Sequence, residues 1–237
     1  MKSVKTYIPN TITCLNLLCG TIATIIALAP ELCPFGGLAP QLWAFVFIGA
    51  AAVFDFCDGF SARLLKAYSP MGKELDSLSD LVSFGIAPAM LVINAVLTAG
   101  GAGWVAASAI LIVICGALRL AKFNVDTRQT TSFIGLPIPA NAIFWIGWLA
   151  WINSHYYPAD WVMFAIIVAV SLLMVSEIKM FSLKFSSWGF RENVRRYLIL
   201  FSALLFILTS GIAGLAWTIL LYLLISVTGK KTDPDAH

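Results

Sequence analysis

Four aspartates lie within 26 residues of a chain that holds only 12 acidic residues in all: Asp55, Asp58, Asp76 and Asp80. The first two directly follow the apolar run 42–54, and carboxylates at membrane depth are expensive and usually functional. Residues three or four apart share one face of a helix, so each pair should point one way. If the two faces meet, four negative charges converge. Divalent cations would offset them, and oxygen ligands favour Mg²⁺, Mn²⁺ or Ca²⁺ over zinc.

Carboxylates that hold two cations suit chemistry at a phosphate, because the cations bind phosphate oxygens and activate a nucleophile. Arg63 follows on the same helical end and could clamp a phosphate, while Gly59 and Ala62 leave room on that face for a bulky ligand. One carboxylate could also act as a general base for a hydroxyl. The alternatives are a buried ion-pair network or a cation pathway. Too few cations lie nearby for simple pairing, and conduction needs weak, serial sites.

The composition predicts an all-α membrane protein. The 237 residues are 60% hydrophobic and 11% charged, with a mean hydropathy of +0.90, and a span needs about 20 apolar residues. We expect one polytopic membrane domain over residues 1–237, with a short interfacial segment at 1–9 and a polar tail at 230–237. About eight spans are predicted, at 10–29, 42–64, 79–98, 103–122, 137–153, 160–177, 196–211 and 213–229. Pro88 predicts a kink or break in the third span.

The basic residues predict the orientation of these spans. All 15 Lys and Arg fall at the termini or in alternate loops, and basic loops face the cytoplasm. We therefore expect both termini and the aspartates at the cytoplasmic face of the cell membrane. The basic stretch 179–196 is expected to lie at the lipid surface.

A second polar stretch contains Arg119, Lys122 and Asn124 and is followed by the proline-rich turn 135–139. Two cations and an amide at the membrane edge could hold a small anion, since Arg recognises carboxylates and phosphates bidentately. The alternative is an ordinary positively charged cytoplasmic loop. Near the N-terminus, three polar residues begin the first span, and they are either ligand residues or ordinary helix-start residues whose threonines bond to their own backbone: Thr11, Thr13 and Asn16.

The aspartates belong to a longer pattern, D-x2-D-G-x2-A-R-x8-G-x3-D-x3-D, which the chain matches at every fixed position from Asp55 to Asp80. This pattern resembles the signature of the CDP-alcohol phosphotransferase family, which moves a substituted phosphate from a CDP-linked donor to an alcohol and releases CMP. The resemblance implies a six-helix core, here with two further C-terminal helices. It also implies two divalent cations and a homodimer, with no role for nucleic acid.

The resemblance implies a role for each matched residue. Asp55, Asp58 and Asp76 would hold the cations, with Asp80 both a ligand and the catalytic base. Contacts to the CDP-lipid would come from seven further positions besides Asp58: Asn10, Thr13, Gly59, Ala62, Arg63, Ser69 and Gly72.

Residues 5–145 further resemble the serine-using branch of the family, the membrane-embedded phosphatidylserine synthases. Transfer of phosphatidyl from CDP-diacylglycerol to L-serine is then expected, with Arg119, Lys122 and Asn124 at the serine. Lys122 occupies a position where the resemblance leads us to expect Arg. Asn16 occupies a position where other branches of the family often carry Arg. Two alternatives stay open. The acceptor could be glycerol 3-phosphate, inositol phosphate or choline, or the protein could be a non-enzymatic cation transporter.

Overall fold

The computed structural model describes residues 7–126, 133–181, 189 and 193–228. The described residues are almost entirely helical: α1 Tyr7–Leu28, α2 Pro40–Leu64, α3 Pro70–Asp80, α4 Ala87–Thr98, α5 Gly103–Ser108, α6 Ile110–Val125, α7 Ile138–Ser154, α8 Asp160–Val175, α9 Val194–Ser210 and α10 Gly214–Thr228. Short 3₁₀ turns lie at Pro30–Leu32 and Gly211–Ala213, and a π-helix at Leu81–Ile86. Residues 7–9 of the expected interfacial segment begin α1, whereas residues 1–6 and the tail lie outside the described residues.

Five helical stretches are long and apolar enough to cross a membrane: Tyr7–Leu28, Pro40–Leu64, Pro70–Thr98, Gly103–Val125 and Val194–Thr228. The predicted class, a multi-pass all-α membrane protein, is therefore confirmed. The count of eight spans stays a prediction, because α9 and α10 fall into one of these stretches and α8 is shorter than a full span.

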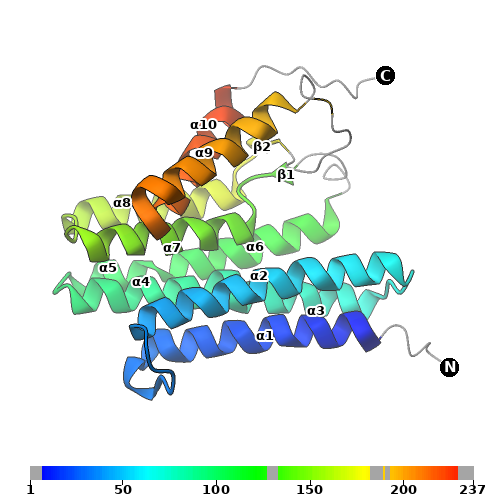
Figure 1. Cartoon of the computed structure of the whole chain (residues 1–237), viewed down its shortest axis with the longest axis horizontal. Helices are drawn as coiled ribbons and strands as arrows, with labels where there is room; N and C mark the ends of the chain where they lie inside the picture. Colours follow the sequence, from blue (N-terminus) through cyan, green and yellow to red (C-terminus); the bar gives the residue numbers. More distant parts are fainter. Residues whose placement is uncertain (1–6, 127–132, 182–188, 190–192, 229–237) are drawn as a thin grey trace.

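The first helix is the scaffold of the N-terminal half. Helix α1 packs along α2 on one side and along α3, the π-helix and α4 on another, whereas α2 and α3 make few direct contacts with each other. Figure 1 shows α1 beside α2. Helix α3 lies behind them in Figure 1, at the end of the bundle where α1 begins and α2 ends. Acidic faces that do not pack together can leave room for a ligand between them.

The third predicted span runs without a break from Pro70 to Thr98, so the alternative of a break at Pro88 was wrong. The π-helix Leu81–Ile86 lies just before the proline, and its wider turns accommodate the ring and the missing N–H that would disrupt an α-helix. The π-helix also directly follows Asp80, the last residue of α3.

The turn 135–139 is tied to the end of α8. Strands β1 (Phe133–Ile134) and β2 (Lys179–Met180) pair antiparallel. The Gly135 N–H donates to the Ile178 carbonyl, and the Leu136 N–H donates to the Leu173 carbonyl. Gly135 has φ +77°, and a Cβ there would meet the Met174 carbonyl at 2.4 Å, so only glycine fits. This turn fixes the start of α7.

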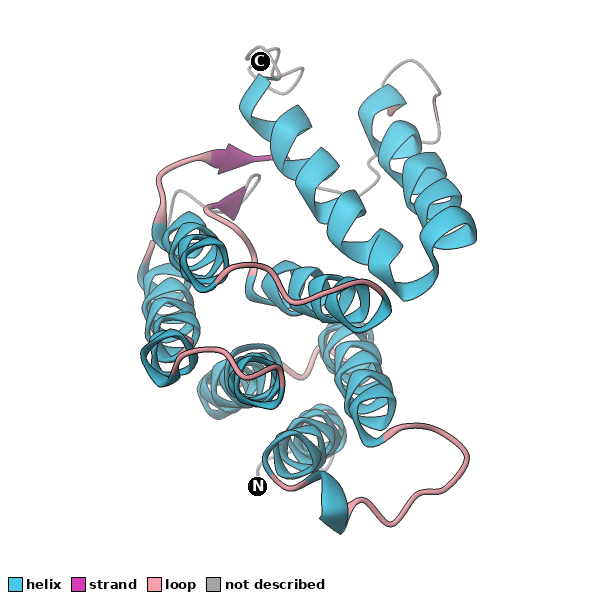
Figure 2. Cartoon of the chain, turned by 90° about the vertical axis from the view of Figure 1, so that its left-hand side faces the viewer, coloured by secondary structure: helices cyan, strands magenta, loops and turns pink. Residues whose placement is uncertain are grey.

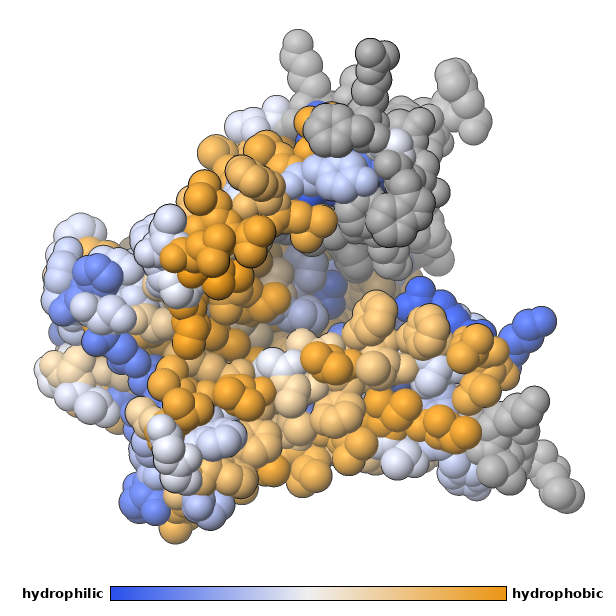
Figure 3. Space-filling model, viewed as in Figure 1, coloured by the Kyte–Doolittle hydropathy of each residue, from blue (hydrophilic) through white to orange (hydrophobic). Residues whose placement is uncertain are grey.

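The last two helices stand apart from the others. Helix α9 contacts mainly α10, which in turn packs on α7, and Figure 2 shows the pair running obliquely to helices that are seen end-on. The surface over α1, α2 and α9 is largely apolar in Figure 3, as expected for helices that face lipid. A recess with hydrophilic atoms at its floor separates α9 from α2 in this view.

Candidate metal centre and substrate cavity

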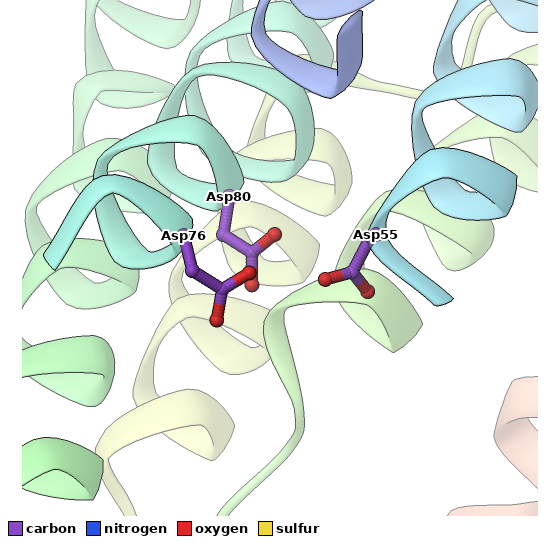
Figure 4. A group of neighbouring side chains, drawn as sticks. All are labelled: Asp55, Asp76 and Asp80. Carbon is purple, nitrogen blue, oxygen red and sulfur yellow. The ribbon is translucent and has the colours of Figure 1, made fainter. Parts of the chain in front are cut away.

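Three of the four aspartates meet between α2 and α3. Asp55 from α2 and Asp76 and Asp80 from α3 each place a carboxylate oxygen within 4.8 Å of the others. Figure 4 shows the three carboxylates pointing toward one another across the gap between the two helices. The expectation that the acidic faces of these helices meet is therefore confirmed for these three residues.

Asp58 lies outside this group of three. It is buried on α2 and lines the neighbouring cavity together with Asp76. Three residues along a helix correspond to a rise of about 4.5 Å, which places Asp58 further toward the helix end than Asp55. Its role as a metal ligand stays a prediction.

Helix α1 holds the α3 carboxylates in place through three hydrogen bonds. The Asn16 amide donates to Asp80 Oδ1 at 3.3 Å. Before Asp80 in the chain, Ser79 donates to the Thr13 carbonyl at 2.8 Å, and after it, Ser83 donates to the Asn16 carbonyl at 3.1 Å. All of these side chains are buried, so α3 has little freedom to rotate against α1.

The unpaired oxygens at this site fit a cation. Asp76 Oδ1 and Asp58 Oδ2 are buried and have no hydrogen-bond partner, although buried carboxylate oxygens normally require one. Between described residues an ion pair joins Lys122 to Glu177, and none there involves Asp55, Asp58, Asp76 or Asp80. An all-oxygen set of this kind suits Mg²⁺, Mn²⁺ or Ca²⁺.

A cavity of about 480 Å³ opens beside the three carboxylates. Six of the predicted CDP-lipid residues and Asp58 line it, from three different elements: Asn10, Thr13, Asp58, Gly59, Ala62, Ser69 and Gly72. Its size falls within the range of ordinary ligand pockets. All of the predicted CDP-lipid residues except Arg63 are thus brought together around one space.

Local interactions explain how two of these residues take their places. Thr13 donates to the Pro9 carbonyl at 3.0 Å, so it bonds to its own helix and lines the cavity as well. Ser69 caps α3 by accepting from the Gly72 N–H at 3.0 Å, with Pro70 as the first helical residue, an arrangement favoured at helix starts. A Cβ on Gly72 would lie 3.0 Å from Asn10 Oδ1, so glycine permits α1 and α3 to approach here.

Arg63 is the predicted residue that does not line the cavity. Its Nε donates to the Gly59 carbonyl at 2.9 Å, and the side chain is exposed. A contact to the CDP-lipid would require it to turn inward, so that role stays a prediction.

The three predicted serine residues lie in different surroundings. Arg119 is only 6% exposed, its Nε has no partner, and it is close enough to Asp80 and Asp55 to interact with both electrostatically. Asn124 instead donates to Ser77 Oγ on α3 at 2.8 Å. Lys122 forms the ion pair with Glu177 that ties α6 to the segment after α8.

Two further residues belong to this region: Lys73, which the sequence analysis did not mention, and Asn16, to which it gave no part in holding the aspartates. Lys73 lines the cavity, and its ammonium donates to the Asn124 carbonyl at 2.9 Å. Asn16 supports Asp80. Their places in the sequence could have indicated these positions. Lys73 directly follows Gly72, and Asn16 lies three residues after Thr13 on the same helix face.

Comparison with known proteins agrees with this geometry. The family model described as CDP-alcohol phosphatidyltransferase matches residues 6–228. The chain is 41% identical over 144 residues to the CDP-diacylglycerol–serine O-phosphatidyltransferase of Methanocaldococcus jannaschii. The matched segment is 61% of this chain and 66% of that protein.

Proteins with the same name in two bacteria are also similar. The Bacillus subtilis protein is 39% identical over 175 residues, which is 73% of this chain and 89% of its own length. The Mycobacterium leprae protein is 36% identical over 183 residues, which is 73% of this chain and 57% of its own length. The matched segments therefore cover from just over half to most of these relatives. The chain belongs to the CDP-alcohol phosphatidyltransferase family.

Proposed function

We propose that the protein transfers the phosphatidyl group from CDP-diacylglycerol to the hydroxyl of L-serine, giving phosphatidylserine and CMP. The observation that carries the proposal is the convergence of Asp55, Asp76 and Asp80 beside a cavity lined by the residues of the family signature. The names of the similar proteins from three organisms support serine as the acceptor.

The cavity residues would bind the CDP-lipid. Asn10 and Thr13 from α1, with Ala62 and Gly72, would surround the nucleotide, and Ser69 and Gly59 would contact the donor. Because the outer sides of the helices carry exposed large apolar side chains, the acyl chains would stay in the bilayer while the head group enters the cavity.

The aspartates would hold two divalent cations, Mg²⁺ or Mn²⁺, with Ca²⁺ also compatible with oxygen ligands. When bound, such cations offset the charge on the diphosphate and on the leaving CMP. The ligands would be Asp55, Asp76 and Asp80 together with Asp58, whose unpartnered buried oxygen is available for this role.

Asp80 would also be the general base. It is only 8% exposed, and the Asn16 amide fixes its Oδ1. From this position it would accept the proton of the serine hydroxyl as the serine oxygen attacks the phosphorus on the lipid side, and CMP would leave.

Arg119 is the best placed of the proposed serine contacts. A buried guanidinium without a hydrogen-bond partner at Nε is suited to a carboxylate, and L-serine carries one. Asn124 and Lys122 are proposed to complete the acceptor side, although each already has a partner within the protein.

The remaining proposals concern the setting of the enzyme. We place the protein in the cell membrane with both termini and the aspartates at the cytoplasmic face, as the distribution of Lys and Arg favours. We further propose that the whole chain is one membrane domain and that it works as a homodimer.

Release of CMP by the purified protein tests the function. The protein is incubated with CDP-diacylglycerol, Mn²⁺ or Mg²⁺, and in separate reactions L-serine, glycerol 3-phosphate, inositol phosphate or choline. We expect CMP and phosphatidylserine with L-serine only. CMP with another alcohol but not with serine would replace the acceptor and keep the chemistry. Metal flux across vesicles without CMP release would support a transporter instead.

A further inference from the structure

An amide lies buried in the middle of the helical bundle, away from the cavity. Asn141 on α7 is fully buried, where a polar side chain is expensive unless its hydrogen bonds are satisfied. Its Nδ2 donates to the Phe84 carbonyl at 3.0 Å, and its Oδ1 accepts from the Trp145 indole at 3.0 Å. Phe84 lies in the π-helix that follows Asp80.

The direction of this amide is fixed by chemistry. The Trp145 indole N–H can only donate, so the Asn141 atom that faces it must be the oxygen. The amide nitrogen is then left to face the Phe84 carbonyl, which can only accept. Trp145 is itself completely buried and lies one turn further along α7, so it locks the amide in this orientation.

The Phe84 carbonyl needs a partner of this kind because of Pro88. In an α-helix this carbonyl would accept from the N–H four residues later, and proline has none. Phe84 is also buried away from water. A buried carbonyl without a donor is destabilising, so the Asn141 amide supplies a donor that the proline cannot, at the point where the helix widens.

The π-helix decides which way the aspartates point. One extra residue in a helical turn rotates everything before it by about 100° relative to everything after it. After the π-helix, Ala87, Ala89 and Val92 are buried. Before it, Asp76 and Asp80 face Asp55 across the gap. Loss of the wide turn would therefore change the direction of these two carboxylates relative to the buried helix that follows.

We propose that Asn141, oriented by Trp145, is a positioning residue for the metal-binding carboxylates, acting through the π-helix from outside the site. It holds the Phe84 carbonyl at the wide turn and thereby supports, together with the hydrogen bonds from α1, the rotation of α3 that brings Asp80 to Asp55. This inference rests on the proposed metal site.

Mn²⁺ binding without substrate tests the proposal. The full chain is purified in detergent, and free Mn²⁺ is measured by electron paramagnetic resonance during titration. Replacement of Asn141 by leucine, which keeps the branched shape and the number of side-chain heavy atoms but cannot donate, should weaken Mn²⁺ binding about 10-fold, the lower end of the effect of losing groups that orient metal ligands. Asn153→Leu is the matched control, since Asn153 lies on the same helix and bonds to Gln41 near the start of α2. It should bind Mn²⁺ as the wild type does.

A second variant keeps the test decisive if Asn141→Leu does not fold. Trp145→Phe keeps an aromatic ring, although a smaller one, and removes the donor that orients the amide, so we expect a smaller loss, of a few fold. Unchanged Mn²⁺ affinity in whichever variant folds would overturn the proposal.

Asp80→Asn separates the positioning role of Asn141 from the existence of the metal site. If it weakens Mn²⁺ binding while the Asn141 and Trp145 variants do not, the metal site stands and the positioning role is wrong. If it has no effect either, the metal site itself is wrong.

Discussion

Replacement of Arg119 by alanine should impair the use of serine selectively. The guanidinium is 6% exposed and its Nε has no partner within the described chain, so a serine carboxylate would meet a desolvated cation. Hydrogen bonds to charged groups contribute about 1.5–3 kcal/mol each. Taking about 3 kcal/mol for the pair, the serine KM should rise about 100-fold.

The effect on the other ligands should differ in direction. Arg119 lies near Asp55 and Asp80 and repels cations there, so its removal should leave Mn²⁺ binding as tight or tighter. The KM for CDP-diacylglycerol should change far less than that for serine. Lys122→Ala is the comparison variant, and a smaller effect on the serine KM is expected because Glu177 already engages this lysine.

Steady-state CMP release with one substrate varied at a time measures both constants. Equal increases in the two KM values would remove Arg119 from the serine site. A larger effect of Lys122→Ala than of Arg119→Ala would show that the carboxylate is held at the other cation.

Three further predictions concern the base, the packing and the opposite end of the bundle. Asp80→Asn should lower turnover at least about 1,000-fold while the protein still binds CDP-diacylglycerol; near-normal turnover would refute its role as base. Gly20→Ala would place a Cβ 2.6 Å from the backbone of the π-helix and should destabilise the protein by about 1–3 kcal/mol, whereas Gly49→Ala meets nothing within 4 Å. Equal melting temperatures for these two variants would contradict the packing. Burial and the hydrogen bond to Asp160 raise the pKa of Tyr157. The contribution of Tyr157 to the stability of the protein is therefore complete below its pKa in the unfolded chain, about 10, and is lost as the pH rises toward its pKa in the folded protein. The melting-temperature difference between wild type and Tyr157→Phe should be constant from pH 7 to 9 and shrink above pH 10; a difference independent of pH would contradict this.

Much of the site could be predicted because its signals are local. The spacing of Asp76 and Asp80 places both on one helix face, and the match of eight fixed positions from Asp55 onward indicates which faces meet. The helical class followed from composition alone. Ser69 and Pro70 mark the start of α3 in the sequence, and the structure begins the helix there.

Other features could not be predicted because they depend on distant partners. Asp58 lies outside the group of three and on the cavity wall, so its place among the metal ligands stays a prediction. Arg63 turns back to its own helix, a choice of side-chain rotamer that spacing does not determine. Pro88 signalled an irregularity, but the partner that allows a π-helix instead of a break is Asn141, 53 residues later in the chain.

The central claim is that the carboxylates of α2 and α3 bind cations together. Crystals of the protein grown with Mn²⁺ and measured at the manganese absorption edge test it most directly. We predict an anomalous difference peak between Asp55, Asp76 and Asp80, within about 2.0–2.6 Å of their oxygens. A peak elsewhere, or carboxylates that are separated and bound to no ion, would contradict the account.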